Sequence, residues 1–397
     1  MKPKLLVLTS TFPRWAGDRE PPFVYELSKR LARWFDIHLL APHAPGAARM
    51  EYMDGMVIRR FPYAPSQWER LAYDGGILST LKEHRSYYLL VPLFLFFQLL
   101  SIIRLIRSEN FDCIHAHWLI PQGLLAVIAK AITGSPSPIL CTSHGGDMYA
   151  LRGRLLDKLK QFVIARVDWL TVVSGAMAEQ AAALGARPGA TNVIPMGVDL
   201  KDRFVPPETE REGKQILFVG RLVEKKGVVY LVRAMSDIIR EHPDARLVIA
   251  GSGPDEVMLR EAAVAGGVND SITFLGPLEN KKLPPLYRSS RIVVFPSVVA
   301  SDGDQEGFGL VQVEALGCRC AVVTTDLPAI RDIITDGETG VVVLQRSESE
   351  LAEAVIRLLD SPSHCTALGT RGRQVMMKKF DWAVIAEKYR NIIESLL

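Results

Sequence analysis

The sequence predicts an α/β protein with two doubly wound parallel-sheet domains. Three observations lead to this fold class. The chain has 397 residues, and at roughly 150 residues per domain this length favours two or three domains. Short apolar runs typical of buried parallel strands alternate with amphipathic helical segments. This alternation stops at Val198 and restarts after Gly213, which divides the chain into halves of similar size.

The first half begins with the apolar run KLLVLT at 4–9, which predicts a buried strand. A helix is expected from Phe23 to Trp34, because Phe23, Leu27 and Leu31 recur at helical spacing. We expect further strands at 36–41, 56–61, 112–116, 138–142, 169–173 and 191–194, with helices that include 122–132, 155–166 and 175–184. Such alternation is typical of a parallel sheet covered on both faces.

The second half follows a segment, 198–213, that lacks periodicity and contains Pro206-Pro207, and we interpret it as an interdomain linker. Strands are then expected at 215–219, 246–250, 271–275, 291–295 and 320–324. Helices are expected at 227–240, 255–265, 309–317 and 349–360. The second half therefore repeats the architecture of the first.

One segment, Tyr87 to Ile103, reads YYLLVPLFLFFQLLSII and carries no charge for 17 residues. As a helix it spans about 25 Å, short of the ~30 Å hydrocarbon core of a bilayer, and Pro92 and Gln98 also disfavour a membrane span. Two interpretations stay open: a helix buried between domain elements, or one lying at the bilayer interface over 87–107. Basic residues flank the run on both sides, at Lys82, Arg85, Arg104 and Arg107.

The composition is that of a globular protein, with 48% hydrophobic and 23% charged residues and a formal charge of +3. It excludes disordered and collagen-like classes and gives no argument for nucleic-acid binding. Residues 1–200 carry 22 basic and 16 acidic side chains, a net +6, whereas the remainder carries 25 and 28, a net −3. The five scattered cysteines predict buried thiols. The run Leu5–Leu8 is too short for a secretory signal, so we expect a cytoplasmic protein.

The stretch from Gly220 to Gly227 reads GRLVEKKG, follows a predicted strand and opens a predicted helix. A glycine at the strand end lets a ligand approach the backbone, and the free N–H groups of a helix start favour an anion. Arg221 adds a planar guanidinium and Lys226 a point charge. The pattern predicts a diphosphate site, and the alternative is a basic, solvated turn.

A second motif, DQEGFGLVQVEA at 304–315, lies between the predicted strand 291–295 and the predicted helix 309–317. Ligands of open α/β sheets bind at the carboxyl ends of the strands. Glu306 in the loop and Glu314 in the helix can both face such a crevice, where carboxylates would accept hydrogen bonds from the vicinal hydroxyls of a sugar or ribose. The alternative is an acidic helix cap and a solvated glutamate.

Together these motifs resemble the retaining glycosyltransferases of family 4, which have the GT-B fold. The spaced glutamates after GRLVEKKG are the most specific part, and weaker matches follow one another along the chain: LVLTSTFPR at 6–14, HAHW at 115–118, SHGGD at 143–147, IPMGVD at 194–199 and IAGSGP at 249–254. The resemblance implies an acceptor-binding Rossmann-like domain at 1–205, completed by a C-terminal helix at 381–397. It also implies a nucleotide-sugar-binding domain at 206–380, facing the first across a cleft.

The resemblance also implies roles for single residues. Arg221 and Lys226 would bind the donor diphosphate and stabilise the leaving group, and Glu306 would contact the transferred sugar. Glu314 would hold the ribose hydroxyls, and His144 would approach the donor sugar from the N-terminal domain. Further donor contacts are expected from backbone groups, at Gly17, Gly220, Gly276, Gly307, Phe308, Gly309 and Leu310, and acceptor contacts are expected at His117 and Asp147.

The chain departs from the family pattern in the loop after the first strand, where members carry a glycine pair and this chain has Gly17 alone. The D-x-D pattern Asp302-Gly303-Asp304 raises the question of a metal, but Arg221 and Lys226 already supply positive charge for the diphosphate. We expect an acidic surface loop there, and a metal-independent enzyme without a cofactor. Same-face attack by the acceptor, as described for this family, requires no protein nucleophile.

The sequence thus predicts a retaining glycosyltransferase that moves a hexose or related sugar from a nucleoside-diphosphate donor to a hydroxyl acceptor. The acceptor is expected to be a saccharide, lipid-linked or part of a surface-polysaccharide precursor, which would place the enzyme at the inner face of the membrane. The alternatives are an epimerase or phosphorylase on the same fold, or a sugar-nucleotide-binding scaffold without turnover.

Overall fold

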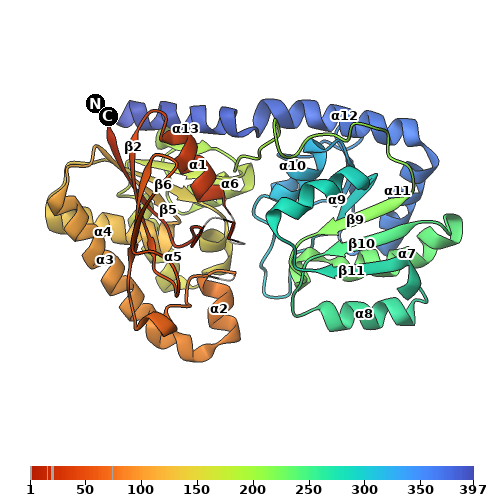
Figure 1. Ribbon diagram of the computed structural model, residues 1–397, viewed down its shortest axis with the longest axis horizontal. Coiled ribbons are helices and arrows are strands. Elements are labelled where there is room, and N and C mark those ends of the chain that lie inside the picture. Colours follow the sequence, from red (N-terminus) through yellow and green to blue (C-terminus); the bar gives the residue numbers. More distant parts are fainter. Residues whose placement is uncertain (1, 16, 19–21, 74) are drawn as a thin grey trace. The chain divides into compact units, whose positions relative to one another are not determined.

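The structure, a computed structural model, describes residues 2–15, 17–18, 22–73 and 75–397. The chain forms two compact units. Unit 1 comprises the described residues up to Val173 together with Met177–Pro195 and Ile385–Leu397, and unit 2 comprises Ser174–Ala176 and Met196–Val384. Figure 1 labels many of the elements of both units.

The sheet of unit 1 has eight strands in the order β3-β4-β2-β1-β5-β6-β7-β8. All neighbours are parallel except the antiparallel pair of β3 and β4. The central strands are buried along their whole length, as their continuous apolar runs predict. The strands are β1 (Lys4–Leu8), β2 (Asp36–Pro42), β3 (Met50–Met53), β4 (Met56–Phe61), β5 (Cys113–His117), β6 (Ile139–Ser143), β7 (Trp169–Val172) and β8 (Thr191–Val193).

The helices in this part of the chain are α1 (Phe23–Leu31), α2 (Ile77–Glu83), α3 (Leu90–Ser108), α4 (Leu124–Thr133), α5 (Arg154–Ile164) and α6 (Gly175–Ala183). The last helix, α13 (Trp382–Leu396), contributes residues from Ile385 onward to unit 1. Its Tyr389 hydroxyl lies 3.4 Å from the hydroxyls of Thr142 and Thr171 on β6 and β7. Helix α13 therefore packs directly on the sheet of unit 1.

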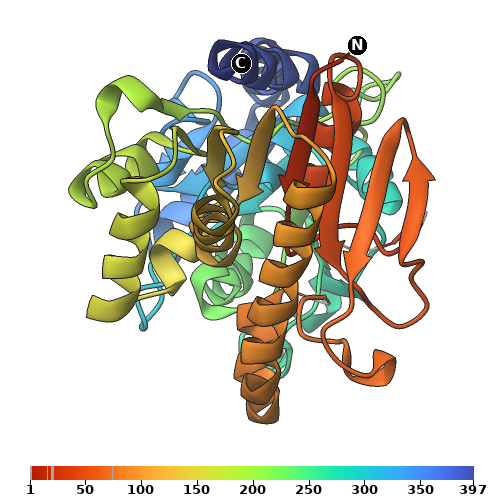
Figure 2. The same ribbon diagram turned by 90° about the vertical axis from the view of Figure 1, so that its left-hand side faces the viewer.

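Helix α3 contains most of the uncharged segment of the sequence. Its inner side packs against the unit through a row of four buried residues, Leu90, Phe94, Gln98 and Ile102. The outer side is open, with Leu93 and Phe96 exposed by 44% and 58%, and Leu89 just before the helix is exposed by 80%. Figure 2 shows α3, in orange, beside α4 with one long side turned outward. The helix is thus only half covered by protein.

The sheet of unit 2 has six parallel strands in the order β11-β10-β9-β12-β13-β14. They are β9 (Gln215–Val219), β10 (Arg246–Ala250), β11 (Ile272–Gly276), β12 (Ile292–Phe295), β13 (Ala321–Thr325) and β14 (Val341–Val343). The order reverses between β9 and β12, and ligands of doubly wound folds bind at the carboxyl ends of strands at such a switch point. Both motifs of the sequence analysis begin there.

Helices cover both faces of this sheet. They are α7 (Val228–Glu241), α8 (Glu256–Ala265), α9 (Leu283–Ser289), α10 (Leu310–Gly317), α11 (Glu348–Asp360) and α12 (Pro362–Lys379). Alternate strand residues, such as Ile216, Phe218 and Val294, form one core with α7, α8 and α11. Figure 1 shows α7 and α8 on one side of β9–β11 and α9 and α10 on the other. The fold class predicted from the sequence is confirmed.

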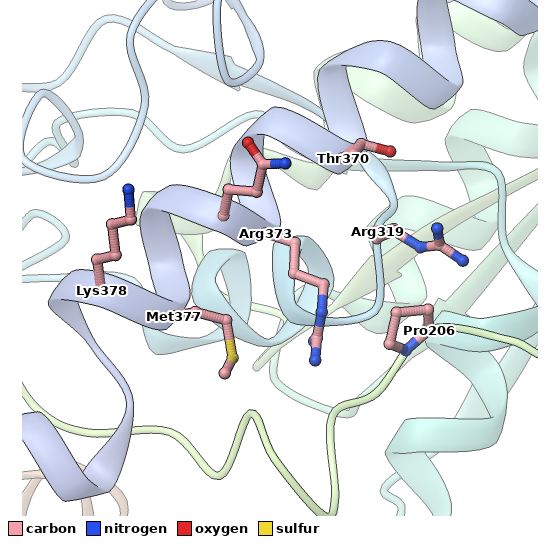
Figure 3. Close-up of a pocket in the computed structure, with 7 residues that line it drawn as sticks. Pro206, Arg319, Thr370, Arg373, Met377 and Lys378 are labelled. Carbon is pink, nitrogen blue, oxygen red and sulfur yellow. The ribbon is translucent and has the colours of Figure 1, made fainter.

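An arginine of α12 hydrogen-bonds to the segment at the start of unit 2, around Leu200 and Phe204. The Arg373 guanidinium donates to the carbonyl of Leu200 at 2.9 Å, to that of Phe204 at 3.1 Å and to that of Gly317. Arg373 also borders a shallow hollow of about 490 Å³ beside α12 (Figure 3). The hollow is lined by Pro206, Arg319, Thr370, Arg373, Gln374, Met377 and Lys378, and none of these is a predicted site residue.

Candidate active site

The loop after β9 has the conformation that its glycines permit. Gly227 adopts a left-handed φ of +61°, and a Cβ there would lie 2.0 Å from the carbonyl oxygen of Pro296, so only glycine fits. Residues Glu224–Lys226 form a 3-10 turn, and α7 begins at Val228. The tight contact with Pro296 brings this loop against the segment that follows β12.

The segment after β12 places Glu306 beside Lys226. The Lys226 ammonium contacts the Glu306 carboxylate, and both side chains are largely buried. Burial opposes ionisation of Glu306, but the charges of Lys226 and Lys225 and the N–H of Phe308 outweigh it and hold the pKa of Glu306 below its usual range. The switch point thus joins two residues that are 80 positions apart in the sequence.

Glu314 lies further along, in the second turn of α10. This helix starts after Gly309, which has a φ of +87°. The Tyr287 hydroxyl donates to Oε2 of Glu314 at 3.0 Å. Burial raises the pKa of Glu314 to about 7, although the Tyr287 hydrogen bond and the charge of Arg203 act in the opposite direction. Glu314 is therefore a carboxyl group that titrates near neutral pH.

The remaining predicted donor residues of unit 2 contribute mainly backbone. The ring of Phe308 is 1% exposed and packs on Phe380, with centroids 5.6 Å apart, so only its main chain can reach a ligand. Gly220 directly follows β9, and Gly276 ends β11 with a φ of +69°. Arg221 is exposed, and Gly307 and Leu310 are half-buried.

In unit 1 the structure brings His117 and His144 together at the ends of β5 and β6. Nδ1 of His117 lies 2.9 Å from Nε2 of His144, and the two rings are stacked at 17°. Burial, and secondarily the charge of His115, lowers the pKa of His144 to about 3. Nδ1 of His144 has no hydrogen-bond partner within the described part of the chain. A buried nitrogen of this kind is one that a ligand or a water molecule would satisfy.

Asp147 and Gly17 have different surroundings from the histidines. The Asp147 carboxylate is buried and accepts hydrogen bonds from the Leu119 N–H at 2.7 Å and the Ser143 hydroxyl at 2.8 Å, so it joins the loops after β5 and β6. Gly17 is exposed with a φ of +81°. Residues 16 and 19–21 next to it lie outside the described residues.

Two features of the site were missed by the sequence analysis. Tyr287, on α9, is fully buried and binds Glu314 across 27 positions of sequence, a separation that no local pattern reveals. Lys225 forms an ion pair with Asp304 at 3.0 Å, which the D-x-D pattern did not suggest. The fold and this site define a class of protein with two α/β units, in which a site suited to an anionic ligand lies at the switch point of one sheet.

Comparison with known proteins gives the family. Residues 22–202 match the family described as Glycosyltransferase Family 4, and residues 201–375 match Glycosyl transferases group 1. The chain belongs to this family of glycosyltransferases, enzymes that use nucleotide-sugar donors. The family resemblance seen in the sequence is thereby confirmed.

Curated relatives share just under a third of their residues with the chain. A GDP-mannose-dependent monoacylated alpha-(1-6)-phosphatidylinositol monomannoside mannosyltransferase of Corynebacterium glutamicum is 29% identical over 74% of this chain and 79% of its own length. A glycogen synthase of Mycobacterium tuberculosis is 29% identical over 70% and 68%. These two relatives differ in what their names say they act on.

Solved structures agree on the fold. Sucrose-phosphate synthase from Thermosynechococcus elongatus has a TM-score of 0.80 at 21% identity and covers 100% of this chain and 99% of its own. HepE of Anabaena in complex with UDP-glucose has a TM-score of 0.72 at 15% identity, covering 99% of both chains. The fold is therefore the GT-B fold that the resemblance implied.

Proposed function

We propose that this enzyme transfers a sugar, with retention, from a nucleoside-diphosphate donor to a hydroxyl of a lipid-linked or surface-polysaccharide precursor at the inner face of the membrane. The observation that carries the proposal is the meeting of Lys226 and Glu306 at the switch point of unit 2. In this proposal Lys226 binds the phosphate and Glu306 the sugar, and their contact supports both roles. Relatives named as mannosyltransferases of phosphatidylinositol or of its monomannoside support a lipid-linked acceptor.

The contact between Lys226 and Glu306 suggests how the donor binds. A diphosphate carries more negative charge than one carboxylate, so it competes for the Lys226 ammonium. Once Lys226 turns to the phosphate, Glu306 faces the sugar, and the charge of Lys225 and the N–H of Phe308 still favour its ionised form. There it can stabilise the positive charge of an oxocarbenium-like transition state, while Lys226 and Arg221 stabilise the leaving diphosphate.

We also propose that transfer requires no metal. The D-x-D residues are already engaged: the Asp304 carboxylate is paired with Lys225 at 3.0 Å, and Oδ1 of Asp302 accepts the N–H of Asp304 at 2.9 Å. Lys226 and Arg221 supply the positive charge that a metal supplies in other transferases.

The first prediction concerns the donor nucleotide. The chain is expected to be stabilised by UDP or by GDP, equally in magnesium and in EDTA, and not by both nucleotides to the same extent. Occupancy at 100 times Kd adds about 2.7 kcal/mol to the free energy of unfolding. The measurement is thermal unfolding with UDP, GDP, ADP and CMP, followed by donor turnover with the UDP- and GDP-sugars.

The outcomes of this experiment distinguish the proposed function from its alternatives. Stabilisation that requires magnesium would contradict metal independence and point to Asp302 and Asp304. No stabilisation by any nucleotide would contradict the donor site at Lys226. Tight binding of a donor that is never turned over would favour a scaffold.

The acceptor side of the proposal rests on α3. The segment Arg85–Ser108 is the one helix in the described chain with the length and apolarity of a membrane span, and 28% of its most apolar window is buried. Its open side combines exposed Leu93 and Phe96 with the exposed cations Arg104 and Arg107. An apolar face with basic ends is typical of a helix that lies in the headgroup region of an anionic bilayer.

The second prediction tests this face. The protein is expected to float with vesicles that contain phosphatidylglycerol, and Leu93→Glu with Phe96→Glu should reduce binding about 100-fold, because two apolar side chains no longer leave water. The matched control is Val257→Glu with Val264→Glu, exposed by 69% and 67% on α8, which should float like the wild type. A wild-type protein that stays unbound with anionic vesicles would contradict the proposal.

A further inference from the structure

Three consecutive side chains of the GRLVEKKG motif bind the loop that carries Glu306. The Glu224 carboxylate accepts both the N–H and the hydroxyl of Ser301, each at 2.8 Å. Lys225 pairs with Asp304 at 3.0 Å, and Lys226 contacts Glu306. We call Glu224 and Lys225, with their partners Ser301 and Asp304, the loop clamp.

The loop of residues 299–306 has no helix or strand of its own. It closes on itself through two backbone hydrogen bonds, from Ala300 N–H to the Asp304 carbonyl at 2.9 Å and from Gly303 N–H to the Ala300 carbonyl at 2.8 Å. At its beginning, the Val299 N–H donates to the Gln345 side chain at 3.0 Å. The closed turn is thus oriented by side-chain contacts, and the loop clamp supplies some of them.

The loop clamp also balances the charges next to Lys226. Two lysines face two carboxylates here, Lys225 with Asp304 and Lys226 with Glu306. When a diphosphate draws Lys226 away, Lys225 stays on Asp304, so the loop keeps its anchor and Asp304 does not repel the phosphate. The pair is only 28% and 27% exposed, which limits its screening by salt.

We propose that Glu224 and Lys225 are positioning residues, which hold the loop so that Glu306 faces the transferred sugar. The inference rests on the proposed function. Neither residue contacts the donor, so their loss affects turnover and leaves nucleotide binding in place. A displacement of Glu306 by about 1 Å is enough for a large loss of rate.

The test compares turnover with nucleotide affinity. Lys225→Met is expected to lower kcat for donor hydrolysis or transfer by about 10- to 100-fold, while the Kd of UDP or GDP changes less than twofold. Lys225→Arg should restore most of kcat. Asp304→Asn should resemble Lys225→Met, and the double variant should be no worse than either single one, because both changes break the same contact.

The matched control is Arg233→Met, which breaks an ion pair with Glu348 at 3.0 Å elsewhere in unit 2. It should leave kcat and Kd unchanged. If Lys225→Met weakens nucleotide binding as much as turnover, Lys225 belongs to the diphosphate site and the proposal is overturned. A kcat of Lys225→Met equal to that of the wild type would also overturn the proposal.

A second measurement does not depend on activity. Hydrogen exchange of residues 299–306, and of the Ser301 amide above all, should become faster in Glu224→Gln and in Lys225→Met than in the wild type. Unchanged exchange in both variants would overturn the positioning role. If the wild type turns over no donor, the proposed function fails, yet the exchange experiment still decides whether the loop clamp holds the loop.

Discussion

Glu306→Gln is expected to lower the kcat of donor turnover by about 10²- to 10³-fold, the loss that follows removal of one group that stabilises transition-state charge. The amide keeps the shape of the side chain but not its charge. Lys226 then loses the carboxylate that it contacts in the absence of donor. We therefore expect UDP or GDP to bind as tightly as to the wild type, or a few-fold tighter. Calorimetry and single-turnover kinetics measure the two effects separately.

The matched control is Glu348→Gln, which removes the charge of another ion-paired glutamate of unit 2 and should leave both quantities unchanged. Weaker nucleotide binding in Glu306→Gln would show that Glu306 supports the phosphate site and does not compete with it. Full turnover in Glu306→Gln would remove Glu306 from the reaction. Stereochemistry of the product separates transfer from an epimerase, and phosphate dependence separates it from a phosphorylase.

The fold was largely predictable because its strands are continuous apolar runs. The elements that the sequence analysis missed are those without such a signal. Strand β3 lies at the edge of its sheet with an exposed and half-exposed pattern, and β14 has only three residues. Helix α12 carries Gly369 and Gly372, which read as helix breakers, yet a Cβ at Gly369 would lie 2.4 Å from the Arg319 carbonyl oxygen, so close packing explains the glycine.

The candidate site was predictable only in part, for a different reason. Motif spacing placed Lys226 and Glu306 at the ends of two strands, and the reversal of strand order made those strands neighbours. Which side chains contact each other depends on their geometry in the fold, and the spacing of motifs in the sequence does not reveal it. The pairing of Asp304 with Lys225, and of Glu314 with Tyr287, therefore became visible only in the structure.

Glu314→Gln is expected to remove the part of the pH dependence of nucleotide binding that comes from the Glu314 carboxyl group. With its pKa raised to about 7, Glu314 is about one-tenth ionised at pH 6 and about nine-tenths ionised at pH 8. Hydrogen bonds from ribose hydroxyls favour the ionised form. The Kd of the preferred nucleoside diphosphate should therefore fall about tenfold between pH 6 and pH 8. At pH 8, Glu314→Gln should weaken binding roughly 10- to 150-fold, the equivalent of 1.5–3 kcal/mol for a hydrogen bond to a charged group.

Tyr287→Phe tests independently in which direction the Glu314 pKa shifts the pH dependence of nucleotide binding. The Tyr287 hydroxyl donates to the Glu314 carboxylate and stabilises its charge, so its removal raises the pKa of Glu314 further and moves the binding transition to higher pH. The phosphate also titrates in this range, but its contribution is common to the wild type and all variants. Glu353→Gln, at an exposed position of α11, serves as the control with a wild-type profile. If Glu314→Gln retains the full pH dependence, Glu314 does not bind the ribose as an ionised carboxylate, because the remaining titration then belongs to the ligand alone.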